Sequence, residues 1–393
     1  MARIADGGQG RHVGSVIALT TLSPVRRERR PELDRRLGIV SRFPPLGRPL
    51  AELAFIHYAR WTVLEAVPAP DGSGAHTPLN SSYLLFESNY NGSLGNYLNA
   101  FTDVLPYRLA RLWGTCQEFE ETVQRAPGAE DRVLSPWAFR SYVARNELEV
   151  LHFHAAYPEA TMIDVRQALA VAEQRRRAQR LRGRDLEDAV RRTVPLVIGP
   201  QPEPLVGLPV AKRHLDAQWR ALTRRYGVNP FALLAPVNAD AADALFDRLR
   251  GWGQDDGGGP LSALSDTHYA RLVRVPPDLK DLGQEAPDAL GLPYLLYTSN
   301  HRGSALDHVG RLRSELGTVA DDIWEHCPGY PGHDDPSFGD WATRHTIGTR
   351  YFVAGYAPHD VGDVREALAD RTRMQAGLWE DGPSPAWLKG NGA

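Results

Sequence analysis

The second half of this 393-residue chain repeats the first half at a nearly constant spacing. The motif His-Tyr-Ala-Arg begins at His57 and again at His268, 211 residues later. At the same spacing the segment 83–89 matches the segment 294–300, and both segments end in Ser-Asn. Further pairs share this spacing: Gly92 with Gly303, Trp113 with Trp324, and Cys116 with Cys327. Agreement at residues as rare as Trp and Cys is not expected by chance, so the repeat indicates an internal duplication.

Both copies show the same order of predicted elements. Expected elements of the first copy are strands at 16–22, around the His-Tyr-Ala-Arg motif, at 83–89 and at 149–157, with a helix near 28–41. Those of the second copy are strands at 231–235, around its motif, at 294–300 and at 349–356, with a helix near 239–251. Ser93 and Ser304 are suited to cap the next helix, and Thr161 and Asp360 to begin the last one. The order β-α-β-β-α-β followed by a helix is the ferredoxin-like arrangement.

We therefore expect an α+β protein made of two tandem ferredoxin-like modules. Each module has an antiparallel sheet with helices on one face, so its other face needs a cover. Packing the two modules sheet to sheet gives that cover and makes an intrachain α+β barrel. The expected organisation is a first module at 12–175, a helical and Pro-rich connector at 176–228, a second module at 229–375 and a flexible tail at 376–393.

Composition limits the class of partner. The net charge is -3 with acids and bases interspersed, so no global field predicts binding to nucleic acid or to an anionic membrane. No apolar run approaches the roughly 18 residues of a membrane span. The chain has two cysteines, too few for a disulfide scaffold. We expect a soluble bacterial protein of the cytoplasm whose partner is a small organic substrate.

The duplicated α+β barrel resembles the superfamily of dye-decolourising peroxidases, chlorite dismutases and cofactor-free α+β-barrel monooxygenases. The patterns at 55–61 and 84–92 are similar to those of a group of uncharacterised bacterial proteins, over most of 15–170 and more weakly in the second copy. The superfamily resemblance implies an oxidoreductase with haem or a His-bound metal as candidate cofactors. The Gly-x-x-Asp-Gly motif of dye-decolourising peroxidases is missing from this sequence, which speaks against a peroxidase of the usual kind.

His57 and His268 are candidate site residues because both copies keep a histidine there. Imidazole can ligate a metal or haem, or transfer protons near neutral pH. A histidine kept in both copies can also serve the fold, through a hydrogen bond to backbone at a strand end. Arg60 and Arg271 lie three residues further on, which predicts the opposite face of the strand. They could bind a carboxylate or a propionate, or form a structural ion pair. We assign His57 a catalytic role, and His268, Arg60 and Arg271 a role in cofactor binding.

His152 and His154 break the symmetry of the repeat. Two residues apart on the last strand of the first copy, they project from one face, where the second copy has Tyr351 and Val353. Divergence of this kind is expected where one copy has acquired a site. The pair could give two ligands to Zn²⁺, Fe or Cu, or act as a general acid/base and its helper. It could equally be two polar residues on a water-lined face.

The leading functional prediction is a small-molecule enzyme, an oxidoreductase of the peroxidase or monooxygenase type, with its site in the cavity between the two modules. One alternative is a cofactor-free cyclase or isomerase with His152 or His154 as the base. Another is a binding or scaffold protein without catalysis. Fold class alone does not choose among these.

Overall fold

A computed structural model describes residues 12–42, 53–125, 134–178, 227–252, 259–279, 288–356 and 358–381, with isolated residues between 180 and 193. The chain is mixed α+β with two antiparallel sheets. The first sheet has the order β1 (His12–Val13), β2 (Val16–Val25), β4 (His76–Asn91), β3 (Ile56–Pro68) and β9 (Tyr351–Ala354). The second has the order β5 (Glu149–Ala155), β7 (Thr267–Val275), β8 (Tyr294–Arg302) and β6 (Val228–Pro236).

The two halves exchange their last strands. β5 belongs to the first half in sequence but pairs with β7, and β9 belongs to the second half but pairs with β3. We expected each module to build its sheet from its own strands, so this pairing differs from that of a self-contained ferredoxin-like module. The exchange has a physical benefit, because β3 and β7 would otherwise leave an edge without a pairing strand.

Short bridges also join the two sheets to each other. Before it reaches β7, the segment 146–148 runs beside β2, where the amide of Leu22 donates to the carbonyl of Asn146 at 2.8 Å. In the same way the segment 345–347 runs beside β6, where the amide of Leu234 donates to the carbonyl of His345 at 2.9 Å. The strands of both sheets are thus hydrogen-bonded in a continuous ring.

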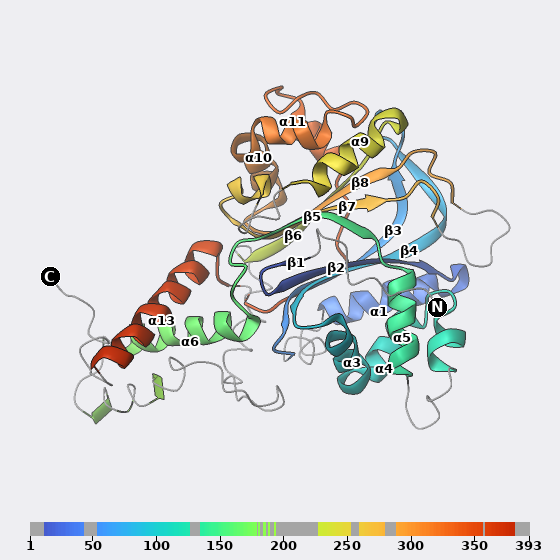
Figure 1. Ribbon diagram of the computed structural model, residues 1–393. Helices are drawn as coiled ribbons and strands as arrows, with labels where there is room; N and C mark the ends of the chain where they lie inside the picture. The colour runs from blue at the N-terminus through green and yellow to red at the C-terminus, as the bar shows by residue number, and fades with distance from the viewer. Residues whose placement is uncertain are drawn as a thin grey trace.

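Helices cover the outer face of each sheet (Figure 1). The helices of the first half are α1 (Arg30–Arg42), α3 (Leu94–Val104), α4 (Pro106–Trp113) and α5 (Pro136–Arg145). Those of the second half are α9 (Ala239–Arg250), α10 (Ala305–Leu316), α11 (Thr318–Trp324) and α12 (Phe338–Arg344). The last helix of each half, α6 (Met162–Ala178) and α13 (Val361–Asp381), packs against its counterpart to form a pair that extends away from the sheets in Figure 1.

The predicted helix starts are confirmed. Ser93 caps α3 by accepting a hydrogen bond from the amide of Asn96, and Ser304 caps α10 in a reciprocal capping box with Asp307. Each helix follows a glycine in the left-handed region, with φ of +90° at Gly92 and +89° at Gly303.

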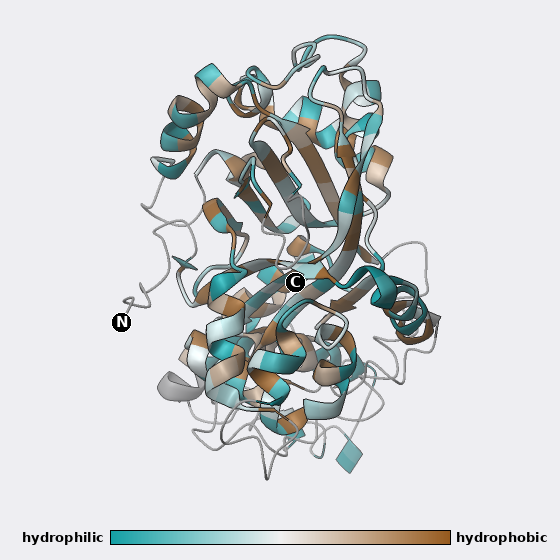
Figure 2. Cartoon of the chain, turned by 90° about the vertical axis from the view of Figure 1, so that its right-hand side faces the viewer, coloured by the Kyte–Doolittle hydropathy of each residue, from teal (hydrophilic) through white to brown (hydrophobic). Residues whose placement is uncertain are grey.

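Three apolar clusters form the core. One lies between the sheets and continues onto α6 and α13, and each of the other two lies between one sheet and its helices. The strands therefore bury both faces, and Figure 2 shows them as largely brown in the middle of the molecule. The space between the sheets is consequently closed to bulk water.

Parts of two predicted segments lie outside the described residues. The connector predicted at 176–228 is described only at its ends, where α6 reaches Ala178 and β6 begins at Val228, and at isolated residues between them. The tail was predicted to begin at 376, but α13 continues to Asp381. Within the described ranges, no helix combines the length and the apolar composition needed to span a bilayer.

Candidate functional site

A network of tyrosines and histidines from both halves lies buried between the sheets. The Tyr157 hydroxyl is 2.7 Å from Nδ1 of His268, and the Tyr356 hydroxyl is 3.0 Å from Nδ1 of His57. Each histidine is therefore bonded to the tyrosine of the opposite half. The two hydroxyls are 2.6 Å apart, and the Tyr269 hydroxyl joins both His57 and Tyr356 at 3.0 and 3.2 Å. All five residues are at most 5% exposed.

Burial decides the protonation states in this network. It lowers the pKa of His57 and of His268 to about 3, so both imidazoles are neutral at physiological pH. It raises the pKa of Tyr157, Tyr269 and Tyr356 above the ordinary range, so the phenols keep their protons. Each neutral imidazole also carries one N–H, on Nδ1 or on Nε2, so Nδ1 can accept from a phenol or donate to it. Several arrangements of the phenol and imidazole protons are therefore compatible with the same five short contacts.

A β-bulge directs each of these histidines inward. The pairing of β3 with β4 shifts register between Ile56 and Tyr58, and that of β7 with β8 shifts between Thr267 and Tyr269. A bulge places an extra residue in one strand and interrupts the alternation of faces. The expectation that His57 and Arg60 lie on opposite faces is therefore wrong, because both side chains reach the space between the sheets.

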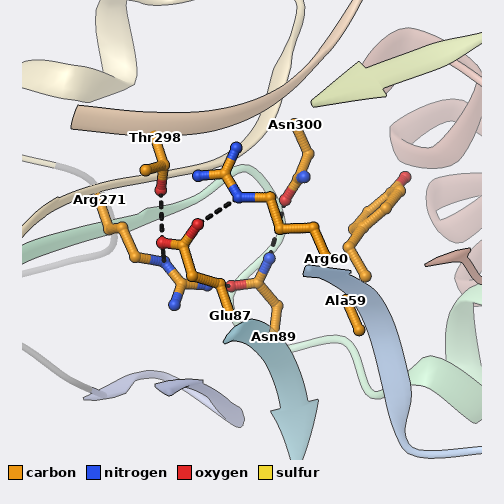
Figure 3. Close-up of a pocket in the computed structure, with 8 residues that line it drawn as sticks. Ala59, Arg60, Glu87, Asn89, Arg271, Thr298 and Asn300 are labelled. Atoms are coloured by element: carbon orange, nitrogen blue, oxygen red, sulfur yellow. Dashed lines mark hydrogen bonds and ion pairs between the residues drawn. The ribbon is translucent and has the colours of Figure 1, made fainter. Parts of the chain in front are cut away.

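Arg60 and Arg271 form a second buried cluster with Glu87 (Figure 3). Nε of Arg60 donates to Glu87, and Nε of Arg271 lies 3.9 Å from the other carboxylate oxygen. Thr298 donates its hydroxyl to Glu87 at 3.0 Å. Both arginines also bond to the backbone of the opposite sheet, Arg60 to the carbonyl of Phe231 at 2.7 Å and Arg271 to that of Leu19 at 2.7 Å. The cluster thus fastens one sheet to the other.

Burial and neighbouring charges shift the pKa values of Glu87 and Arg271 in this cluster. Burial raises the pKa of Glu87, but the two guanidinium groups outweigh burial and the pKa ends below its ordinary value. Burial lowers the pKa of Arg271 to about 10, against the opposing effect of Glu87. Both groups therefore remain charged at neutral pH, and a small cavity of about 10 Å³, close to the size of one water molecule, lies among them.

His152 and His154 lie elsewhere. Nδ1 of His152 is 3.1 Å from the carbonyl of Trp252, and the ring packs against Gly259. This histidine therefore lies on the outer face of the second sheet, which the helices of the second half cover. Alternation along β5 places buried His154 on the same face, whereas Phe153 between them stacks on Tyr269 in the central space. His57 and His268, which both halves share, meet in one network between the sheets, whereas His152 and His154 project from the opposite face of their sheet.

Sequence reasoning missed a third constellation, between β8 and α10. Oγ of Ser299 is 2.8 Å from Nε2 of His308, whose ring stacks on His301 with centroids 4.0 Å apart. The repeat carried a signal for it, because at a spacing of 211 residues the first half has Tyr90 and Tyr97 at these positions, also stacked at 3.9 Å. A search for matched positions at which the residue type changes between the halves, rather than for positions at which it is identical, would have found this constellation.

Within the described part of the chain, each of the two shared histidines has one ring nitrogen engaged and one free. Nδ1 of each ring is engaged by a phenol, and Nε2 of each ring is buried without a hydrogen-bond partner among the described residues. Within the described residues, no group of three or more His, Cys, Asp or Glu side chains is arranged to hold a metal ion.

A larger opening lies next to the network, between α6 and α13. This groove has a volume of about 290 Å³ and is lined by acidic Asp363 and Glu366, basic Arg175 and Arg176, and His359. His359 is also a neighbour of His268 and influences its pKa through both its charge and its backbone. The groove therefore places a space of small-ligand size beside the tyrosine–histidine network.

Comparison with known proteins assigns no family: no protein-family model, curated protein or solved structure matches this chain.

Proposed function

We propose that this chain is an oxidoreductase acting on a small organic molecule, and that the buried phenol–imidazole pairs carry its chemistry. The observation that supports the proposal most is the 2.7 Å contact between the Tyr157 hydroxyl and Nδ1 of His268. We further propose that the ring of strands is a duplicated α+β barrel of the ferredoxin-like type. The reciprocal contacts Tyr157–His268 and Tyr356–His57 support this, because they relate the halves by a twofold exchange.

A phenol bonded to a neutral imidazole is suited to one-electron oxidation. The oxidant comes from solution and is a strong one-electron acceptor such as an oxidised metal complex. When it takes an electron from the tyrosine and is itself reduced by one electron, the phenol becomes a far stronger acid and the imidazole takes its proton. The products are a neutral tyrosyl radical and an imidazolium. When a substrate then supplies one electron, the proton returns from the imidazolium, and tyrosine and imidazole are restored. The substrate is oxidised by one electron and releases its own proton to solvent.

Burial favours this chemistry over simple acid–base catalysis. The pKa of His268 is about 3, so its imidazole is a weak base toward an ordinary substrate at neutral pH. The raised pKa of Tyr157 likewise keeps the phenol from ionising without oxidation. Water exclusion also protects a radical from side reactions. The groove beside His359 is the proposed place from which the substrate delivers its electron.

Electron paramagnetic resonance tests the proposal. The full chain is treated with hexachloroiridate(IV), a one-electron oxidant, and frozen. We expect a tyrosyl signal that weakens in Tyr157→Phe and in Tyr356→Phe, because each variant removes one pair, and that weakens further when both tyrosines are replaced. The matched control is Tyr294→Phe, since Tyr294 is equally buried but donates to the carbonyl of Pro68, outside the network. Adding hydroquinone should shorten the life of the signal. A wild-type protein without a signal, or a signal equal in all variants, would refute the proposal.

A second candidate is a purely structural role for the network, within a protein without catalysis. It is favoured by the complete burial of His57, His268 and Tyr356. On this view the phenol-to-Phe variants lose stability, measured by urea unfolding, while the wild type gives no tyrosyl signal. The two readouts separate the candidates.

A further inference from the structure

The last helices of the two halves, α6 and α13, match each other at a spacing of 199 residues. The segment 167–170 reads Gln-Ala-Leu-Ala and the segment 366–369 reads Glu-Ala-Leu-Ala, and Asp164 corresponds to Asp363. The two helices pack together in a pair that extends away from the sheets (Figure 1). The pair therefore contains the same place twice, once beside Asp164 and once beside Asp363.

Beside Asp164, an arginine of the chain itself fills this place. Nη1 of Arg371 donates to Oδ1 of Asp164 at 3.0 Å, and Nη2 donates to Oε1 of Gln167 at 2.7 Å. The Arg371 side chain is 7% exposed. A guanidinium group that donates through two of its nitrogens is held in a defined orientation. The place beside Asp164 is thus a guanidinium site, and its occupant comes from α13.

Beside Asp363, the matching arginine is missing. Ala172 corresponds to Arg371, and the groove of about 290 Å³ between α6 and α13 lies at this alanine. Asp363 and Glu366 line the groove and correspond to the two residues that hold Arg371. The side chain of Asp363 is 49% exposed, so the groove is open to solvent. The short side chain at 172 therefore leaves the acceptors of a guanidinium site without their guanidinium group.

The two arginines that line the groove are paired with other acids. Arg175 lies 2.9 Å from a carboxylate oxygen of Asp370, and Arg176 lies 3.0 Å from one of Glu173. These pairs leave the carboxylates of Asp363 and Glu366 as the charges without a matching cation from α6. The groove therefore favours a cationic ligand over an anionic one.

Both carboxylates can accept from a ligand. Within the described residues, Glu366 makes no ion pair or hydrogen bond. Asp363 uses Oδ2 to accept from the amide of Asp360, and Nδ1 of His359 lies 3.8 Å from the same oxygen. Oδ1 of Asp363 corresponds to the oxygen of Asp164 that accepts from Arg371. The acceptor geometry of the filled place is thus available in the open one.

We propose that this groove binds an organic cation with a guanidinium head. The head occupies the place that corresponds to the Arg371 guanidinium group and donates to Asp363 and Glu366. An apolar tail lies on Leu169 and Ala172, which also line the groove. The inference deepens the proposed function, and it rests on that function where it makes this cation the substrate. Binding itself requires no oxidation.

Isothermal titration calorimetry of the full chain tests the site. The probe is n-butylguanidinium, and the control ligand is n-butylurea, which has nearly the same shape without the charge. The buffer has low salt and a pH of about 8, at which an ordinary histidine is neutral and does not compete for Asp363. We expect one site per chain for n-butylguanidinium, with a Kd lower than that of n-butylurea by about tenfold or more.

Two variants assign the binding to this place. Ala172→Arg gives the groove a guanidinium group of its own, as in the other half, so binding of n-butylguanidinium should be lost. Arg371→Ala opens the place beside Asp164, so the number of sites should rise from one to two. Both changes test the same correspondence, from opposite directions.

A third variant tests the charge and guards against a misfolded protein. Glu366→Gln copies Gln167 of the filled place and should raise the Kd of n-butylguanidinium by about tenfold. The matched control is Asp243→Asn on α9, an exposed carboxylate outside the groove that should leave the Kd unchanged. If Ala172→Arg does not fold, Glu366→Gln decides.

Equal affinity for n-butylguanidinium and n-butylurea would overturn the proposal, and so would binding that neither Ala172→Arg nor Glu366→Gln weakens. The titration contains no oxidant, so its failure leaves the tyrosyl signal of the proposed function untouched. A missing tyrosyl signal would likewise leave the binding result in place. The two proposals can therefore fail separately.

Discussion

The two halves of the molecule share their backbone plan but differ in polar chemistry at matching positions. Beneath the helices of the first half, Tyr90 stacks on Tyr97 with centroids 3.9 Å apart. Beneath those of the second half, His301 stacks on His308 at 4.0 Å in the same place. The two rings are therefore stacked in the same way in both halves, although the side chains differ. The space between strand and helix is retained, while the acid–base chemistry within it is not.

A second difference lies between the sheets, where Glu87 of the first half corresponds to Thr298 of the second. Here the two residues meet, because the hydroxyl donates to the carboxylate. The halves have thus become complementary instead of equivalent: one supplies the charge and the other a donor. Each of these differences can be tested by a substitution that makes the two matched residues alike or removes the side chain of one of them.

The largest effect at neutral pH is expected at Glu87. Glu87→Gln keeps the shape of the side chain but leaves Arg60 and Arg271 buried without a carboxylate. We expect the free energy of unfolding to fall by about 3–5 kcal/mol, as when one member of a buried ion pair is removed. Urea unfolding followed by tryptophan fluorescence measures the change.

The matched substitution in the second half is Thr298→Val. It removes one hydrogen bond to a charged acceptor, so the expected loss is about 2 kcal/mol. Equal losses for Glu87→Gln and Thr298→Val would mean that the hydrogen bond, rather than the carboxylate charge, holds the two sheets together.

Much of the secondary structure could be predicted because the repeat presents each pattern twice. Strands around His57 and His268 and caps at Ser93 and Ser304 agree with the structure. The exchange of β5 and β9 could not be predicted, since an edge strand's partner depends on which edge is free in three dimensions.

The candidate site was predictable only in part. The sequence indicates His57, His268, Arg60 and Arg271, and the structure places all four between the sheets. The histidines and arginines face the same space because each strand contains a one-residue bulge. The alternation of hydrophobic residues in the sequence does not reveal such a bulge. Tyr157 and Tyr356, which bond to the two histidines, directly follow β5 and β9. Their roles become evident only when it is known that these two strands pair with the opposite half.

A separate effect, on the pH dependence of stability, concerns the stacked histidines of the second half. Burial lowers the pKa of His301 to about 3 and that of His308 well below its ordinary value. Between those values and an unfolded pKa of about 6.5, the unfolded chain binds protons that the folded chain does not. Stability therefore rises with pH in this window and is lost as pH falls. Replacing both histidines with tyrosine, as in the first half, should reduce the slope by up to about 2.7 kcal/mol per pH unit.

Urea unfolding between about pH 6 and pH 4 measures this slope. The control is Tyr90→Phe with Tyr97→Phe, because neither phenol titrates in this window and the slope should stay unchanged. A slope unaffected by the His301→Tyr and His308→Tyr pair would mean that the two imidazoles bind protons in the folded state as readily as in the unfolded one.

The smallest effect distinguishes the caps of α3 and α10. Ser93 accepts one hydrogen bond, from the amide of Asn96 at 3.2 Å. Ser304 accepts from the amide of Asp307 at 3.1 Å and also donates its hydroxyl to the Asp307 carboxylate at 2.7 Å. Ser304→Ala should therefore cost about 1 kcal/mol and Ser93→Ala about 0.5 kcal/mol. Thermal unfolding of both variants beside the wild type measures the difference. Because the fold around Gly92 and Gly303 is the same, a larger loss at Ser93 would mean that tertiary packing, not the capping box, decides how firmly each helix begins.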